Sequence, residues 1–153
     1  MGNSVKEEFG FMTTIAMASD HAGVDLRATL KALLEGEGHQ VLDLGPDSPA
    51  SVDYPDYANR LAEALQQGRA DQGLLICGSG IGISIAANRH RHVRAALCHD
   101  VTTARLCRLH NDANVLVLGA RVIGPEVAID CARVFFGTAF EGGRHARRVN
   151  MLG

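Results

Sequence analysis

The architecture of this chain is organised around the stretch Leu74-Leu75-Ile76-Cys77-Gly78-Ser79-Gly80-Ile81-Gly82-Ile83-Ser84. An apolar run ends here in a loop that carries one thiol, one hydroxyl and three glycines, and the pattern predicts a helix over 83–88. In such a strand–loop–helix unit, backbone N–H groups at the helix start point into a pocket, and glycines let a ligand approach closely. A tight turn with a buried structural cysteine is the alternative interpretation of the same residues.

The composition indicates one globular domain. Of 153 residues, 46% are hydrophobic and 21% are charged, which is enough apolar material for a core. The net charge of -2 and the pI near 6.4 argue against a strong field for nucleic acid or anionic membranes. We expect residues 1–12 to be a disordered extension and residues 13–153 to form the domain. The sequence lacks a membrane-length apolar run, a secretory leader pattern and paired cysteine spacing, which favours free thiols in the cytoplasm.

Apolar runs alternate with helical periodicity on both sides of this stretch. Strands are predicted over 14–18, 41–45, 73–76, 95–97 and 115–118. Helices are predicted over 26–34, 56–67, 83–88, 101–109 and 125–136, with a last short helix in the basic tail 141–148. The alternation predicts an α/β fold with a five-stranded, mostly parallel sheet covered on both faces. The usual dinucleotide fingerprint and the P-loop are both missing from the sequence.

Polar residues follow the predicted strands. Because loops after parallel strands emerge at the same edge of a sheet, we expect four segments to meet there. These segments are Asp20-His21, the 77–82 loop, His99-Asp100 and Arg121. A carboxylate, imidazoles, a thiol, backbone donors and a guanidinium would then share one rim, which favours a ligand site over a simple turn.

Each of these residues also has a purely structural interpretation. Asp20 can cap the following helix, and His21 can be a solvated loop residue. His110 can lie at the end of a helix, where its charge complements the helix dipole. A solvated basic face is the alternative for the tail residues Arg144, Arg147 and Arg148. A metal site built from histidines is disfavoured because the spacing of the candidates matches no recognised site: His90, His92 and His99.

Six segments occur in one order along the chain. They are Ser19-Asp20-His21-Ala22-Gly23, Asp53-Tyr54-Pro55, Ile76 to Asn88, His110 to Leu116, Gly119-Ala120-Arg121, and Glu141-Gly142-Gly143-Arg144-His145 with Arg148. Taken together, the chain from about Thr14 to its C-terminus resembles the type B ribose-5-phosphate isomerase family, which includes galactose-6-phosphate isomerase subunits. The resemblance implies a Rossmann-like three-layer sandwich that isomerises a phosphorylated sugar, with neither a metal nor an organic cofactor. It further implies a homodimer or dimer of dimers with active sites at the subunit boundary, and neither nucleic acid nor membrane as a partner.

The resemblance also implies a role for each matching residue. Cys77 is expected to be the base that removes the proton beside the carbonyl. His110, lent by the neighbouring subunit and assisted by Asp20, is expected to open the sugar ring. Phosphate is expected to bind His21, Arg121, Arg144 and Arg148. Contacts to the sugar are expected from Tyr54 and Asn111. Ser79 is expected to be catalytic, since its hydroxyl can donate to the thiolate or the enediolate. The loop residues expected to bind the substrate or its oxyanion are Gly78, Gly80, Ile81 and Gly82.

The chemistry of these residue types suits isomerisation through a cis-enediolate. One base must carry a proton between adjacent carbons, and a helix N-terminus favours the thiolate form of a cysteine. Backbone N–H groups of the glycine loop can stabilise the developing oxyanion. An imidazole beside a carboxylate suits ring opening because imidazole titrates near neutral pH. Arginine forks match phosphate oxygens, and Arg144 and Arg148 share a face if the tail is helical.

Two positions distinguish this chain within the family that it resembles. Many members carry threonine at the position of Ser79, and either hydroxyl can serve. Other members replace the cysteine by serine and place a glutamate base at the position of Ile83, so Cys77 places this chain with the cysteine-using kind. Ribose 5-phosphate is the expected substrate, while the loop 46–52 could set a tetrose or hexose phosphate instead. Two further functions fit such a fold, a non-catalytic sugar-phosphate-binding module and a thiol redox protein, although the latter lacks a resolving cysteine at a motif spacing.

Overall fold

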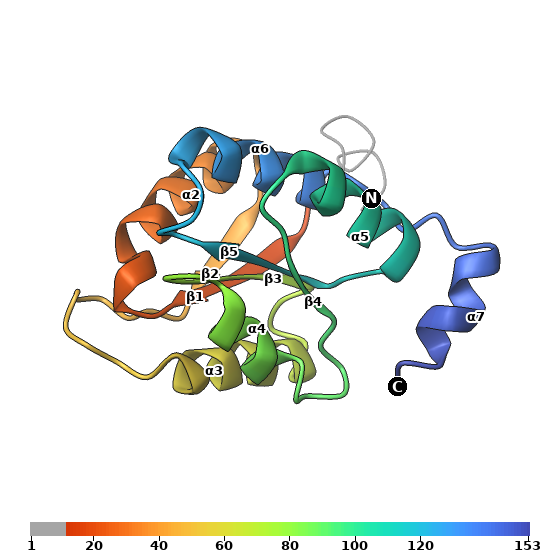
Figure 1. The fold of residues 1–153 in the computed structure, drawn as a ribbon, viewed down its shortest axis with the longest axis horizontal. Helices are drawn as coiled ribbons and strands as arrows, with labels where there is room; N and C mark the ends of the chain where they lie inside the picture. Colours follow the sequence, from red (N-terminus) through yellow and green to blue (C-terminus); the bar gives the residue numbers. More distant parts are fainter. Residues whose placement is uncertain (1–11) are drawn as a thin grey trace.

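A five-stranded sheet forms the middle layer of the structure, a computed structural model that describes residues 12–153 (Figure 1). The predicted extension therefore lies, except for Met12, outside the described residues. Neighbouring strands run in the order β2-β1-β3-β5-β4, and all four pairings are parallel. The strands are β1 Thr14–Ser19, β2 Gln40–Asp43, β3 Gln72–Cys77, β4 Ala95–Leu97 and β5 Val115–Gly119. The prediction of an α/β sheet is confirmed, and among the described strands the sheet is parallel throughout.

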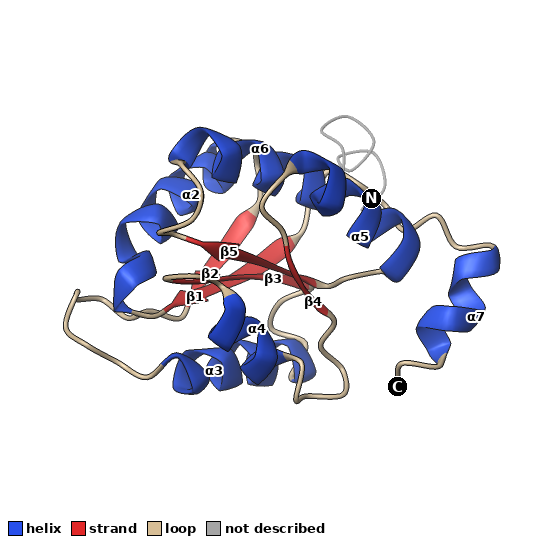
Figure 2. Ribbon diagram, viewed as in Figure 1, coloured by secondary structure: helices blue, strands red, loops and turns tan. Residues whose placement is uncertain are grey.

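Helices cover both faces of the sheet, so the fold has three layers (Figure 2). On one face lie α2 Val24–Gly36, α5 Val101–Asn111 and α6 Pro125–Phe136. On the other face lie α3 Tyr54–Gln66 and α4 Ile81–Ala87. The last helix, α7 Arg144–Asn150, stands outside the layers and packs beside α5 (Figure 1). Every residue of β5 is buried, as expected for a central parallel strand whose two faces are both covered.

The chain changes direction across the sheet between β1 and β3. From β1 it passes to β2 on one side, and it returns through α3 to β3 on the other side. The backbone N–H of Asp20 donates to the carbonyl of Ile76 at 3.0 Å, which ties together the ends of these two strands. In open α/β sheets, ligands bind where the strand order reverses, at the carboxyl ends of the strands.

Several element boundaries differ from those expected. Helix α3 begins two residues earlier than predicted, because extended Asp53 precedes it and Pro55 fits the first turn. Helix α4 begins at Ile81 instead of residue 83, directly after Gly80 in the left-handed conformation. A 3-10 turn over His21–Gly23, which the sequence pattern did not predict, connects β1 to α2. No helix within residues 12–153 combines the length and the apolar character needed to cross a bilayer.

Candidate active site

Cys77 is the last residue of β3 and faces the start of α4. Its side chain is buried, and its Sγ accepts a hydrogen bond from the backbone N–H of Gly80 at 3.2 Å. Gly80 has a φ of +79°, and a Cβ there would lie 2.4 Å from a methyl carbon of Leu97. Only glycine can therefore bring this N–H to the sulfur without strain. The sulfur is therefore held by a backbone donor that directly precedes α4.

Arg121 lies directly beside the cysteine loop. The backbone N–H of Arg121 donates to the carbonyl of Gly78 at 2.9 Å, and that of Ala120 donates to the backbone carbonyl of Cys77 at 2.9 Å. The guanidinium lies over Gly78, where a Cβ would come within 3.3 Å of Nη1. The loops after β3 and β5 are thus joined through their backbones, and they place a permanent positive charge near the thiol.

Asp20 and His21 follow β1 at the same edge. The carboxylate of Asp20 accepts the backbone N–H of Ala22 at 2.9 Å and caps the 3-10 turn, whereas the predicted helix α2 begins after Gly23. Nδ1 of His21 accepts the backbone N–H of Val52 at 3.2 Å. Because a backbone N–H can only donate, this contact leaves the ring proton on Nε2 and makes that atom a hydrogen-bond donor.

Tyr54 and Ser79 complete this edge. Tyr54 begins α3 and lies over Gly82, where a Cβ would come within 2.6 Å of the phenol ring. The hydroxyl of Ser79 accepts the backbone N–H of Ile81 at 3.2 Å. In the predicted segment His99-Asp100, the carboxylate of Asp100 caps a helix and accepts the backbone N–H of Thr103 at 2.7 Å. We refer to the assembled residues as the carboxyl-edge site: Asp20, His21, Tyr54, Cys77 to Gly82, and Arg121.

The remaining predicted residues lie at the opposite edge of the sheet. Helix α5 begins after β4 at the carboxyl edge and ends at Asn111, four residues before β5 begins at its amino end. His110 and Asn111 therefore lie at the amino edge, whereas Cys77 closes β3 at the carboxyl edge. Helix α7, which carries Arg144 and Arg148, lies beyond the same end of α5 (Figure 1). A single chain thus does not bring these four residues to the thiol, and the predicted set of four phosphate-binding residues is divided.

His110 is surrounded by residues from the tail. The backbone N–H of Glu141 donates to the carbonyl of Leu109 at 3.1 Å, which brings its carboxylate to 3.8 Å from Nε2 of His110. The ring of His145 stacks on that of His110, with centroids 4.4 Å apart and planes inclined by 17°. Within one chain the carboxylate beside His110 is therefore Glu141, while Asp20 lies at the other edge. We refer to His110, Glu141 and His145 as the tail cluster.

The tail cluster is also the described group whose residue types best suit a metal ion. Its candidate ligand atoms lie within 4.8 Å of one another. The nearly parallel rings argue against coordination, because the lone pairs of stacked imidazoles do not converge on one point. Burial, together with the nearby charge of His110, lowers the pKa of His145. Two of the histidines whose spacing disfavours a metal site have other contacts, since His90 contacts Asn59 and His92 contacts the carbonyl of Ala62.

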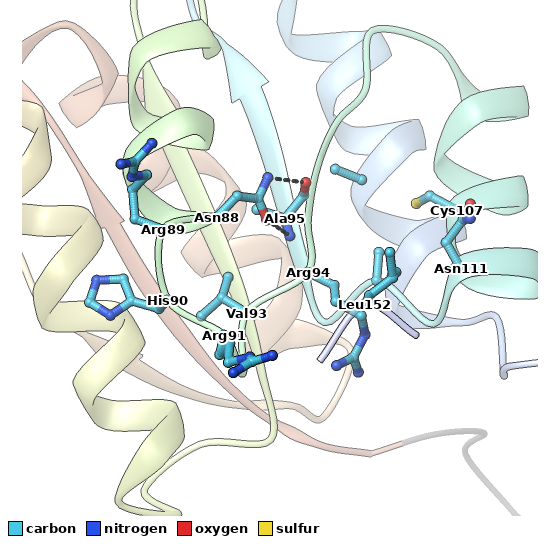
Figure 3. Close-up of a pocket in the computed structure, with 12 residues that line it drawn as sticks. Asn88, Arg89, His90, Arg91, Val93, Arg94, Ala95, Cys107, Asn111 and Leu152 are labelled. Atoms are coloured by element: carbon cyan, nitrogen blue, oxygen red, sulfur yellow. Dashed lines mark hydrogen bonds between the residues drawn. The ribbon is translucent and has the colours of Figure 1, made fainter. Parts of the chain in front are cut away.

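A cavity of about 410 Å³ opens at the amino edge (Figure 3). It is lined by the basic loop Arg89-His90-Arg91 and, across from that loop, by Asn111 and Cys107 of α5. Cys77 does not line it. Asn111 is the one predicted site residue in its wall, so this cavity is separate from the carboxyl-edge site.

Glu141 and His145 are the neighbours of His110 to which the sequence pattern assigned no role. The sequence predicts a helix within 141–148, but α7 begins only at Arg144, so Glu141 precedes the helix and helical spacing does not relate it to His145. Their contact with the end of α5 depends on tertiary structure, and no local sequence pattern predicts it.

Comparison with known proteins covers nearly the whole chain. The family model described as Ribose/Galactose Isomerase matches residues 15–152. Ribose-5-phosphate isomerase B of Escherichia coli is 44% identical over 141 residues, covering 92% of this chain and 95% of that protein. D-erythrulose-4-phosphate isomerase of Pectobacterium atrosepticum is 41% identical over 143 residues, covering 93% and 94%. The crystal structure of a ribose 5-phosphate isomerase from Thermotoga maritima has a TM-score of 0.90 at 48% identity, covering 93% and 98%.

Proposed function

Because the chain belongs to the ribose/galactose isomerase family, we propose that it interconverts ribose 5-phosphate and ribulose 5-phosphate, with Cys77 as the base. The isomerase class follows from the family and from relatives that match nearly the full chain. The observation that supports the base is the environment of Cys77. Its Sγ accepts the N–H of Gly80, next to a loop joined by its backbone to Arg121.

The central step moves one proton between neighbouring carbons. The Cys77 thiolate removes the proton from C2 of the open-chain aldose, and the electron pair moves to form the C1–C2 double bond of a cis-enediolate. The resulting thiol returns the proton to C1, while a proton passes from the oxygen on C2 to the oxygen on C1. The N–H groups of Gly80 and Ile81 donate to Cys77 and to Ser79. The other N–H groups of the 78–82 loop and the Ser79 hydroxyl stabilise the charge on these oxygens, an effect worth about 100- to 1000-fold in rate for a single donor.

Ring opening and part of the phosphate binding require a second copy of the chain. His110, Asn111, Arg144 and Arg148 lie at the amino edge, away from Cys77 in the same chain. If two copies associate with opposite edges facing, each carboxyl-edge site receives the missing residues from its partner. The exposed apolar side chains of Ile81 and Ile85, next to the cysteine loop, support such an association because they would otherwise remain in water.

The phosphate of the substrate would then be held by groups from both copies. His21 offers an Nε2–H donor, and Arg121 offers a guanidinium at the carboxyl edge. Arg144 and Arg148 are exposed on α7, so they are free to reach a neighbouring molecule. Binding energy from the phosphate positions the reacting carbons without taking part in the proton transfer.

A four-carbon sugar phosphate is the alternative substrate. The relative that acts on D-erythrulose 4-phosphate is nearly as similar to this chain as the ribose-5-phosphate isomerase. A coupled assay that compares kcat/KM across tetrose, pentose and hexose phosphates decides between them. We expect the highest value for ribose 5-phosphate, and a higher value for a tetrose phosphate would replace it as the substrate.

Substitution of the thiol tests the proposed base. We expect Cys77→Ala to abolish isomerisation while leaving binding of the phosphorylated sugar largely intact, because the thiolate acts on the carbon and not on the phosphate. Turnover and calorimetric binding of ribose 5-phosphate are measured in parallel. The matched control is Cys131→Ala, which removes a buried thiol on the core-facing side of α6. Retained turnover in Cys77→Ala would remove this residue from the base role.

A further inference from the structure

We infer that His145 is a positioning residue that holds His110 and the tail arginines in one geometry. The inference rests on the proposed function for its catalytic meaning, since it concerns the acid/base and phosphate-binding residues of that reaction. The observation that carries it is the ring stack at the junction of α5 and α7. One side chain joins the helix that presents His110 to the helix that presents Arg144 and Arg148.

In the stack of the two imidazole rings, His145 is buried and His110 is partly exposed. His145 is 8% exposed as a whole residue, whereas the side chain of His110 is 39% exposed. Their centroids lie 4.4 Å apart with nearly parallel planes. His145 thus packs against one face of the more accessible His110 ring, and the rest of the His110 side chain remains accessible to a substrate.

The same residue fixes the place of α7. This helix stands outside the three layers and packs against α5 (Figure 1). The backbone bond from Glu141 to Leu109 precedes it, and His145 is the buried residue in its first turn. Arg144 and Arg148 are both exposed and lie four residues apart on α7, where they flank the position of His145. A shift of the His145 ring would therefore move both guanidinium groups together with the His110 ring.

The role of the His145 ring is contact and not proton transfer. Its Nε2 is buried and has no hydrogen-bond partner. The charged or titratable groups that face it are His110, Arg144, Arg148 and Glu141, of which only the carboxylate favours a proton on the ring. A neutral aromatic ring of similar shape should therefore replace it.

The test compares His145→Ala with His145→Phe. We expect kcat/KM of the alanine variant to fall about 10- to 100-fold, with kcat lowered and KM raised, because catalytic groups misplaced by about 1 Å lose activity on that scale. Phenylalanine keeps the stack and should stay within about threefold of the unmodified protein. The matched control is Arg147→Ala, an exposed position on the same helix that lies outside the proposed machinery.

A second measurement is independent of activity. In proton NMR, the His110 ring signal, assigned by its loss in His110→Ala, should shift when alanine removes the ring current of His145 and should remain shielded with phenylalanine. If the protein turned over none of the sugar phosphates, the proposed function would fail while this NMR comparison still tested the stack. An unchanged His110 signal and kcat/KM in His145→Ala would overturn the inference. A phenylalanine variant as impaired as the alanine variant would overturn it as well, because the ring nitrogens would then be needed.

Discussion

At the scale of single residues, the cysteine loop depends on glycines that allow close contacts. Gly80 brings its N–H to Cys77 in a conformation that a side chain would strain, and Gly82 leaves room for the ring of Tyr54. The two glycines thus act at different points. The first supports the sulfur, and the second lets an aromatic side chain lie against the loop.

Gly82→Ala tests the contact with Tyr54. The added methyl group would lie 2.6 to 3.0 Å from the ring, so the ring must move. Because Tyr54 is 40% exposed, it can move outward, and we expect a folded protein whose kcat/KM is about tenfold lower, mainly through KM. Steady-state kinetics and thermal unfolding are measured together.

The control for this substitution is Gly36→Ala. Nothing lies within 4 Å of the added methyl group at the end of α2, so activity should be unchanged and stability should rise by about 0.4–1 kcal/mol. Equal kinetics in the two alanine variants would show that Tyr54 makes no contact that matters to the substrate.

The sequence was sufficient to predict most single-residue placements at the carboxyl edge. Asp20, Cys77 and Arg121 each follow a buried strand, and parallel strands bring their loops together by geometry alone. The contact between His110 and His145 could not be predicted in this way. It depends on where a peripheral helix docks, and 34 residues of intervening chain, including a strand and α6, separate the two histidines.

At the scale of elements, the sequence pattern predicted each β-strand and α-helix, but the ends of only some of them. The helix Pro125–Phe136 and the strand Ala95–Leu97 have the predicted bounds. Helix α4 begins early because Gly80 turns the chain into it, and the pattern of apolar residues carries no information on that dihedral angle. The 3-10 turn after β1 was missed since three residues are too few for a periodic signal.

The docking of α7 should depend on pH. Burial lowers the pKa of His145 below its ordinary value of 6.5, so the unfolded chain takes up a proton that the docked ring resists. The contribution of His145 is therefore complete above pH 6.5 and is lost as the pH falls through this range. We expect the drop in thermal stability between pH 8 and pH 5.5 to be smaller in His145→Phe than in the unmodified protein. An equal drop in both proteins would contradict this assignment.

At the scale of the whole molecule, the division of the proposed site between two sheet edges predicts shared active sites. We mix Cys77→Ser with His110→Ala, each inactive alone, under conditions that exchange subunits. Random pairing makes half of the pairs mixed, and each mixed pair has one complete site, so about a quarter of the unmodified activity should return. Subunit exchange is verified by native mass spectrometry. Exchange without recovered activity would show that Cys77 and His110 of different subunits do not form a shared active site.

The placement of Cys77 and His110 at opposite ends of one protomer also has a genetic consequence. With active sites shared as proposed, a subunit substituted at both positions would inactivate both sites of any dimer that it forms with an intact subunit. An allele encoding such a subunit would be dominant, whereas two alleles damaged at one position each would rescue one another in the same cell.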